Sequence, residues 1–167
     1  MLSTGFIAHI ATHGFFLPAK SKLNCGFAMQ QDAMFRSGLV LAGSDKIWTN
    51  KKIISGKDDG ILTSYEIAQM DLSSTDLVVI SACETALGDL QNNEGVIGLQ
   101  RAFKLAGVKQ IIISLWSVPD IETAELMSLF YSNWIKGESP REALRSAQLV
   151  LKTKYQPYDW AAFVLVE

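Results

Sequence analysis

The chain has little cysteine, no excess of one charge and no long apolar run, and each shortage excludes a class of protein. Its two cysteines, Cys25 and Cys83, lie in different contexts, which is not the disulfide framework of a small secreted domain. The 15 basic and 17 acidic residues give a net charge of −2, so no basic nucleic-acid surface is expected. No run approaches the roughly 20 apolar residues that cross a bilayer, and residues 1–5 lack the charged region of a signal peptide.

What is present is an ordinary globular composition, with 49% hydrophobic and 19% charged residues. A chain of 167 residues is long enough to bury one core, so we expect a single domain over residues 1–167. A reducing, cytoplasmic setting is the simplest interpretation of the cysteines, and it would keep thiols free. We expect no membrane contact and no cofactor.

Apolar runs alternate with segments of helical periodicity. Strands are predicted at residues 6–12, 38–43, 77–83, 110–116 and 161–166. Helices are predicted at residues 65–70, 94–106, 121–136 and 140–154, and irregular segments at 15–31 and 44–60. Strands that are apolar along their whole length are typical of parallel sheets with both faces buried. The sequence therefore predicts an α/β fold with a mostly parallel sheet flanked by helices.

Local signals mark several helix ends. Gly107 follows the last apolar residue of the second predicted helix and fits a C-terminal stop. Ser139 and Glu142 have the spacing of a capping box, and Thr63 or Ser64 can cap the first short helix.

A histidine and a cysteine stand at the ends of two predicted strands. His13 follows the strand at 6–12, Cys83 ends the strand at 77–83, and the third strand ends at Trp116 and Ser117. In open α/β sheets, ligands bind outside the carboxyl ends of the strands. We therefore expect His13 and Cys83 to meet in one cleft, which is what a cysteine nucleophile with a histidine base requires.

Other interpretations of these residues are possible on pattern alone. A lone cysteine such as Cys83 is often a buried structural residue, and His13 could serve only as a hydrogen-bonding strand end. His9 and His13 have the H-x-x-x-H spacing, but zinc sites of that spacing need a helix. On a strand the two imidazoles would lie about 13 Å apart. We therefore interpret His9 as structural and expect no metal.

Seven blocks of sequence carry a more specific signal. They are IATHGFF (10–16), SGLVLAG (37–43), DGILTSYE (59–66), DLVVISACETALG (76–88), EGVIGLQRAF (94–103), SLWSVPD (114–120) and PYDWAAFV (157–164). In this order they resemble the CHAT domain, the caspase-like peptidase module often fused to tetratricopeptide repeats. The match covers nearly the whole chain, although no single block would suffice.

The resemblance implies a caspase-like fold and a cysteine endopeptidase with a His–Cys dyad. It gives His13 the role of general base and Cys83 that of nucleophile, with the backbone N–H groups of Gly14 and Cys83 binding the oxyanion. It also implies a protein or peptide substrate, and partnership with tetratricopeptide-repeat regions of a parent protein that govern activity.

Four further residues are expected near the substrate. In caspase-like folds the segment after the third strand lines the substrate pocket, which implicates Trp116, Ser117 and Asp120. Asp120 would favour a basic substrate side chain, or it would cap the helix that follows. Glu84 follows the nucleophile directly and would orient the cleft loop or cap its turn.

Two departures from the family lead to an alternative function. CHAT domains generally carry further strands before the histidine block, so we expect the sheet to be incomplete on its N-terminal side. The tetratricopeptide repeats are also absent from this sequence. The alternative is a non-catalytic interaction module or a pseudo-protease fragment.

Overall fold

The computed structural model describes residues 6–17, 33–44, 59–81, 83–84 and 94–167. Its main sheet has the order β1-β5-β7-β8. The strands are β1 (Phe6–Ile10), β5 (Thr75–Ile80), β7 (Gln110–Ser114) and β8 (Phe163–Val166). The first three run parallel, and β8 pairs antiparallel with β7. The predicted α/β fold with a mostly parallel sheet is therefore confirmed.

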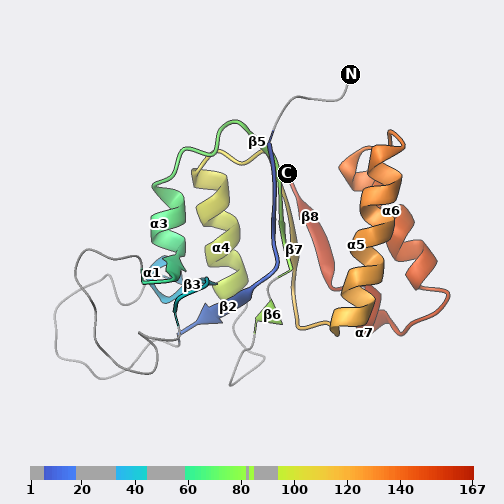
Figure 1. Cartoon of the computed structure of the whole chain (residues 1–167), viewed down its shortest axis with the longest axis horizontal. Helices are drawn as coiled ribbons and strands as arrows, with labels where there is room; N and C mark the ends of the chain where they lie inside the picture. The colour runs from blue at the N-terminus through green and yellow to red at the C-terminus, as the bar shows by residue number, and fades with distance from the viewer. Residues whose placement is uncertain (1–5, 18–32, 45–58, 82, 85–93) are drawn as a thin grey trace.

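Helices cover both faces of this sheet (Figure 1). On one side lie α1 (Ala33–Arg36), α3 (Ser64–Ala68) and α4 (Glu94–Leu105). On the other side lie α5 (Asp120–Ile135), α6 (Pro140–Leu151) and the short α7 (Pro157–Trp160). The sequence predicted four of these helices and missed α1 and α7, each of which has four residues and therefore too little periodicity to detect.

A second, smaller sheet lies at the carboxyl end of the main one (Figure 1), with the order β4-β3-β2-β6. Its strands are β4 (Ile61–Thr63), β3 (Ser37–Val40), β2 (His13–Phe16) and β6 (Cys83–Glu84). The predicted strand at 6–12 thus ends at Ile10, and a new strand begins at His13. The prediction of an irregular segment from residue 15 was wrong for Phe15 and Phe16, which belong to β2.

Two apolar cores, one on each face of the main sheet, hold the layers together. Val78 and Ile80 of β5 pack with α4, whereas Leu77 and Val79 pack with α5 and α6. All four are at most 1% exposed. Because successive strand residues point to opposite faces, a strand buried on both sides must be apolar throughout. The continuous apolar run in this part of the sequence therefore identified the central strand correctly.

Capping interactions set the helix ends as expected. The hydroxyl of Ser139 accepts from the backbone N–H of Glu142 at 3.3 Å, and a carboxylate oxygen of Glu142 accepts from the N–H of Ser139 at 3.1 Å. Thr63 caps α3 with the same reciprocal bonds. Gly107 follows α4 with φ of +97°, a conformation that costs glycine little. Helix α6, however, ends at Leu151, short of the predicted 154.

Close packing of α4 on the small sheet depends on one glycine. A Cβ placed on Gly98 would lie 2.5 Å from the Oγ of Ser37. That hydroxyl is already fixed, because it donates to the carbonyl of Ala33 at 2.7 Å and contacts the Oγ of Ser64 at 2.8 Å. A side chain at position 98 would therefore push α4 away from β3.

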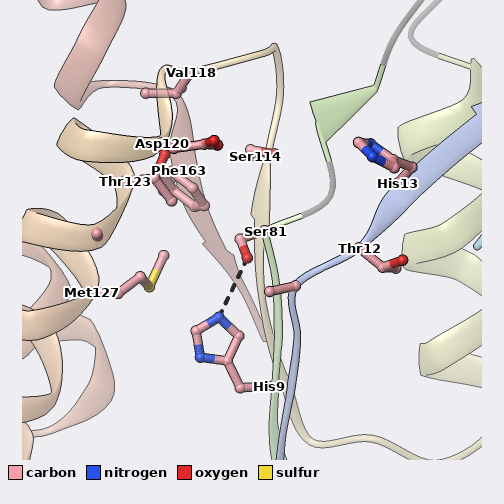
Figure 2. Close-up of a pocket in the computed structure, with 12 residues that line it drawn as sticks. His9, Thr12, His13, Ser81, Ser114, Val118, Asp120, Thr123, Met127 and Phe163 are labelled. Atoms are coloured by element: carbon pink, nitrogen blue, oxygen red, sulfur yellow. Dashed lines mark hydrogen bonds between the residues drawn. The ribbon is translucent and has the colours of Figure 1, made fainter. Parts of the chain in front are cut away.

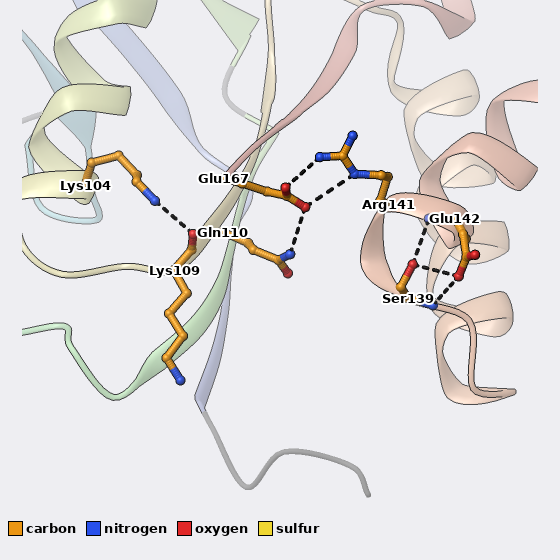
Figure 3. Close-up of polar contacts among 7 residues, drawn as sticks. All are labelled: Lys104, Lys109, Gln110, Ser139, Arg141, Glu142 and Glu167. Atoms are coloured by element: carbon orange, nitrogen blue, oxygen red, sulfur yellow. Dashed lines mark hydrogen bonds and ion pairs between the residues drawn. The ribbon is translucent and has the colours of Figure 1, made fainter.

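Polar contacts gather at the opposite, amino-terminal edge of the parallel strands (Figure 3). Arg141 of α6 pairs with Glu167, which follows β8, at 2.6 Å, and Gln110 at the start of β7 donates to the same carboxylate. The Nζ of Lys104 donates to the backbone carbonyl of Lys109 at 2.8 Å. These groups are exposed and therefore screened, so the sheet depends on its apolar cores rather than on them.

The burial of β5 gives a stability prediction. Val79 is 0% exposed, so Val79→Asp places an unpaired carboxylate inside the core and should lower the free energy of unfolding by about 4 kcal/mol or more. Val150→Asp is the matched control, because Val150 on α6 is 41% exposed. Thermal unfolding followed by circular dichroism measures both. Equal melting temperatures for Val79→Asp and the original chain would contradict the burial of β5.

Candidate active site

A pocket lies at the carboxyl edge of the parallel strands, between that edge and the start of α5 (Figure 2). Its volume is about 390 Å³. Its lining residues come from the ends of β1, β5 and β7 and the segments that follow them, from the start of β2, from α5 and from β8: His9, Ala11, Thr12, His13, Ser81, Ser114, Val118, Asp120, Thr123, Ala124, Met127 and Phe163. This is the edge at which the sequence analysis expected a ligand to bind.

The backbone brings His13 and Cys83 together next to this pocket. Strands β2 and β6 pair in parallel, with His13 opposite Cys83 and Gly14 opposite Glu84. In the main sheet, Ile10 of β1 pairs with Ile80 of β5. Each of these two chain segments advances three residues on its way to the small sheet, so the register between them is preserved. His13 and Cys83, far apart in sequence, are consequently neighbours across two strands.

The turn between β1 and β2 is held by two hydrogen bonds. The backbone N–H of Ser81 donates to the carbonyl of Ile10 at 3.1 Å, which extends the β1–β5 ladder by one step. The hydroxyl of Thr12 donates to the carbonyl of Val40 on β3. These contacts fix the point at which the chain leaves the main sheet and place His13 at the start of β2.

His13 and Gly14 differ in exposure. The side chain of His13 is exposed and lines the pocket, so a bound molecule can reach it. Gly14 is buried, with Leu39 of β3 on one side and Glu84 of β6 on the other.

A second histidine, His9 of β1, lines the same pocket and makes two side-chain contacts. Its Nδ1 lies 3.0 Å from the hydroxyl of Tyr131 on α5, and its Nε2 lies 3.4 Å from the Oγ of Ser81. The rings of His9 and Tyr131 are tilted, with centroids 5.7 Å apart. His9 therefore links β1, the end of β5 and α5 at the base of the pocket. The sequence analysis interpreted His9 as structural and did not place it in this cavity.

Burial shifts the proton equilibria of this histidine and its partner. Partial desolvation lowers the pKa of His9 below its ordinary value of 6.5, because the cationic ring is the form that loses hydration. Desolvation likewise raises the pKa of Tyr131 above 10.0, since the phenolate would be the charged form. At neutral pH both groups are therefore uncharged, and the pair is held by a neutral hydrogen bond.

Asp120 lines the pocket at the end away from His9 (Figure 2). It is the first residue of α5, and Pro119 holds the N-cap position without a side-chain capping bond. The interpretation of Asp120 as a helix cap was therefore wrong. Proline at the N-cap lets the helix begin one residue earlier, and a carboxylate in the first turn still interacts favourably with the helix dipole.

Three further residues were named from sequence, and two of them, Trp116 and Ser117, are not among the described residues that line the pocket. The indole N–H of Trp116 donates to the carbonyl of Tyr158 at 2.8 Å, and the two rings stack. Ser117 is exposed in the segment between β7 and α5. Glu84 lies in β6, its backbone paired with Gly14. Asp120, unlike Trp116 and Ser117, is among the described residues that line the pocket.

Sequence reasoning missed much of the pocket wall. Met127 and Ala124 lie on α5, and Phe163 begins β8. Their sequence signals are those of ordinary core residues, so nothing distinguished them before the fold was known. Ser81, by contrast, stands two residues before Cys83 at the end of the central strand, and that position could have marked it.

The H-x-x-x-H spacing has no metal-site geometry. His9 and His13 lie on two extended strands in different sheets rather than on one helix. Among the described residues, no three His, Cys, Asp or Glu side chains form a group able to hold a metal ion. Within the same part of the chain, the helices are all too short or too polar to span a membrane.

Comparison with known proteins gives a family match and two relatives. The family model described as CHAT domain matches residues 4–167. Tetratricopeptide repeat protein 28 of Mus musculus and that of Homo sapiens are each 30% identical over 109 residues. The aligned part covers 64% of this chain and 4% of each relative, so the chain spans only a small part of the length of these proteins.

The contact between His9 and Tyr131 generates a prediction about pKa. Tyr131→Ala should admit water to the imidazole and return the pKa of His9 upward towards 6.5, because burial is what lowers it. Tyr131→Phe, which keeps the ring and removes the hydroxyl, should leave that pKa low. Proton NMR of the two imidazoles against pH measures both variants. A pKa that is unchanged in Tyr131→Ala would show that the lowering has another cause.

Proposed function

The chain belongs to the CHAT domain family, whose fold is caspase-like and related to peptidases, and from that premise we propose that it is a cysteine endopeptidase acting on a protein substrate. His13 is the general base and Cys83 the nucleophile. The observation that supports this proposal best is the parallel pairing of β2 with β6, in which His13 lies opposite Cys83.

The proposed chemistry follows from the position of these two residues beside a pocket. His13 takes the proton of the Cys83 thiol, and the thiolate attacks the carbonyl carbon of the scissile peptide bond. The C–N bond then breaks as His13 gives that proton to the departing amine, which leaves a thioester on Cys83. A water molecule, deprotonated by His13, then hydrolyses the thioester and restores the thiol. The exposure of His13 supports this role, since the base must reach both the leaving group and water.

We also propose an oxyanion site formed by the backbone N–H groups of Gly14 and Cys83. Gly14 directly follows His13 and is paired with Glu84, which directly follows Cys83. The two donors therefore belong to neighbouring strands and are offset by one residue in the pairing. Donors aimed at a developing oxyanion typically contribute about 100- to 1,000-fold to the rate.

The pocket supports a preference for a basic side chain on the substrate. Its walls include apolar groups of Val118, Met127 and Phe163, which suit the aliphatic stem of arginine or lysine. Asp120 supplies a carboxylate for the cationic head.

The residues beside the pocket complete the proposed cleft. We assign Trp116 and Ser117, which lead from β7 to the pocket wall, to contact with the substrate backbone, and Glu84 to orientation of the cleft loop. Tetratricopeptide repeats, which the relatives are named for, would recognise the protein substrate. A cytoplasmic, reducing location would keep the thiol of Cys83 available.

Covalent labelling tests the dyad. A fluorescent acyloxymethyl ketone peptide should label the original chain, and Cys83→Ala should abolish labelling because the nucleophile is gone. His13→Ala should slow labelling by about 100-fold or more through loss of the base. It should leave the melting temperature almost unchanged, since the side chain is exposed.

The labelling results distinguish a peptidase from a non-catalytic interaction module. Cys25→Ala is the matched control, and it should be labelled at the original rate. Labelling that persists in Cys83→Ala would remove the proposed nucleophile. A folded parent protein that carries its repeats and is not labelled at all would favour the alternative, a non-catalytic interaction module.

The acidic residue of the pocket gives a specificity prediction. Asp120→Asn should lower the labelling rate of an arginine-containing probe by about tenfold or more relative to its citrulline analogue, because a charge-assisted hydrogen bond is lost. Asp71→Asn, in the turn before β5 at the far edge of the sheet, should keep the original ratio. A ratio that stays constant in Asp120→Asn would contradict the role of Asp120 in selecting a cation.

A further inference from the structure

We propose that His9 is a specificity-determining residue: the neutral imidazole admits a cationic side chain to the pocket, and the protonated imidazole excludes it. The inference rests on one part of the proposed function, namely that this pocket receives a substrate side chain. It does not require His13 or Cys83 to be catalytic. His9 takes no part in the proposed dyad, and this proposal gives it a function of its own.

The shape of the pocket brings a bound cation close to His9. Asp120 and His9 line opposite ends of the same 390 Å³ cavity, with Ser81 between them (Figure 2). A guanidinium group on an aliphatic stem that passes the apolar wall formed by Met127 and Phe163 therefore enters a space whose base is the His9 ring. Any charge on that ring therefore acts on the guanidinium at short range within the same cavity.

The contacts of His9 keep its ring facing the cavity. Tyr131 holds Nδ1 at 3.0 Å from behind, on the side of α5, and Nε2 faces Ser81 at 3.4 Å. The bond to Tyr131 is short and the one to Ser81 is long, so a ligand can replace Ser81 as the partner of Nε2 without releasing the ring from α5.

Protonation changes what this ring offers to a ligand. A neutral imidazole keeps one nitrogen that accepts a hydrogen bond, whereas in the cation both nitrogens donate. Protonated His9 would therefore oppose a guanidinium twice, as a donor facing donors and as a like charge.

The other ionisable groups around the ring are few. Among the described residues that line the pocket, His13 on β2 and Asp120 on α5 are the titratable groups besides His9. Tyr131, also on α5, contacts the ring directly. Asp120 is the one that carries negative charge, and neutral Tyr131 adds none. The net charge that a ligand meets therefore changes from negative towards neutral as His9 is protonated.

The direction of the pH effect follows from burial. Because desolvation lowers the pKa of His9 below 6.5, the ring is neutral at physiological pH and becomes charged only in more acidic solution. The pocket should therefore accept cations at neutral pH and lose that preference as the pH falls.

Binding of two small probes to the full chain tests the proposal without any reaction. The probes are n-butylguanidinium and N-butylurea, which share shape and differ in charge. Chemical-shift titrations give both dissociation constants, and we expect the preference for guanidinium to fall about fivefold between about pH 8 and about pH 5. The chain has two histidines, so their NMR signals are assigned directly by substitution.

Thermodynamic reciprocity gives an independent readout. If protonated His9 weakens guanidinium binding, then saturating guanidinium must lower the pKa of His9 further, by the same factor. Butylurea should leave that pKa nearly unchanged. A merely structural histidine would show neither effect.

Two substitutions assign the effect to His9. His9→Gln keeps a hydrogen-bonding side chain that does not titrate, so its preference for guanidinium should vary much less with pH than that of the original chain. His13→Gln should retain the full pH dependence. A full effect in His9→Gln, a constant preference in the original chain, or no binding of guanidinium at any pH would each overturn the proposal.

These failures differ from failure of the proposed function. Absence of Cys83 labelling with normal guanidinium binding would remove the peptidase and keep the role of His9 in the pocket. Normal labelling of Cys83 with pH-independent probe binding would keep the peptidase and remove the role of His9.

Discussion

The parallel pairing of two chain segments across a break in the sheet is the constraint on which the site depends. Residues 6–10 and 75–80 pair in the main sheet, and residues 13–14 and 83–84 pair again in the small sheet, with the register of Ile10 and Ile80 kept. If only one of them changed sheets, His13 and Cys83 would separate. The break opens space at the carboxyl edge, and the pocket occupies that space.

Much of this fold was predictable, because a strand that is buried on both faces has a continuous run of apolar residues. The central residues of β5 and β7 are apolar, and strands were predicted there, although the strand predicted at 77–83 runs from Thr75 to Ile80 and the one predicted at 110–116 ends at Ser114. The end of β1 at Ile10 was not predicted, because Ile10 and the next residue, Ala11, are both apolar. What ends β1 is tertiary: Thr12 bonds to Val40 of a strand that arrives from elsewhere in the chain. Short elements such as β4 left no periodic pattern.

The candidate site was predictable to the extent that strand ends define it. His13 and Cys83 were placed at one edge from the order of strands alone, and their backbones are paired there; their roles in catalysis stay a prediction. The position of His9 in the pocket was not predicted, because its spacing from His13 suggested only a metal site. Such a site needs a helix, and this segment is extended. Its real partner, Tyr131, lies on a helix far along the chain, and no local pattern connects them.

Two histidines of one short segment thus reach one pocket with different surroundings. His13 begins β2 and is exposed, and its neighbour across the sheet is Cys83. His9 remains in β1 and is also exposed, but Tyr131 and Ser81 contact its ring, and partial desolvation disfavours its charge. A group that moves protons needs access to water and substrate, whereas a group that sets the charge of a pocket needs a fixed position. The break between β1 and β2 supplies both environments within five residues, because it turns one continuous strand into two that end in different sheets.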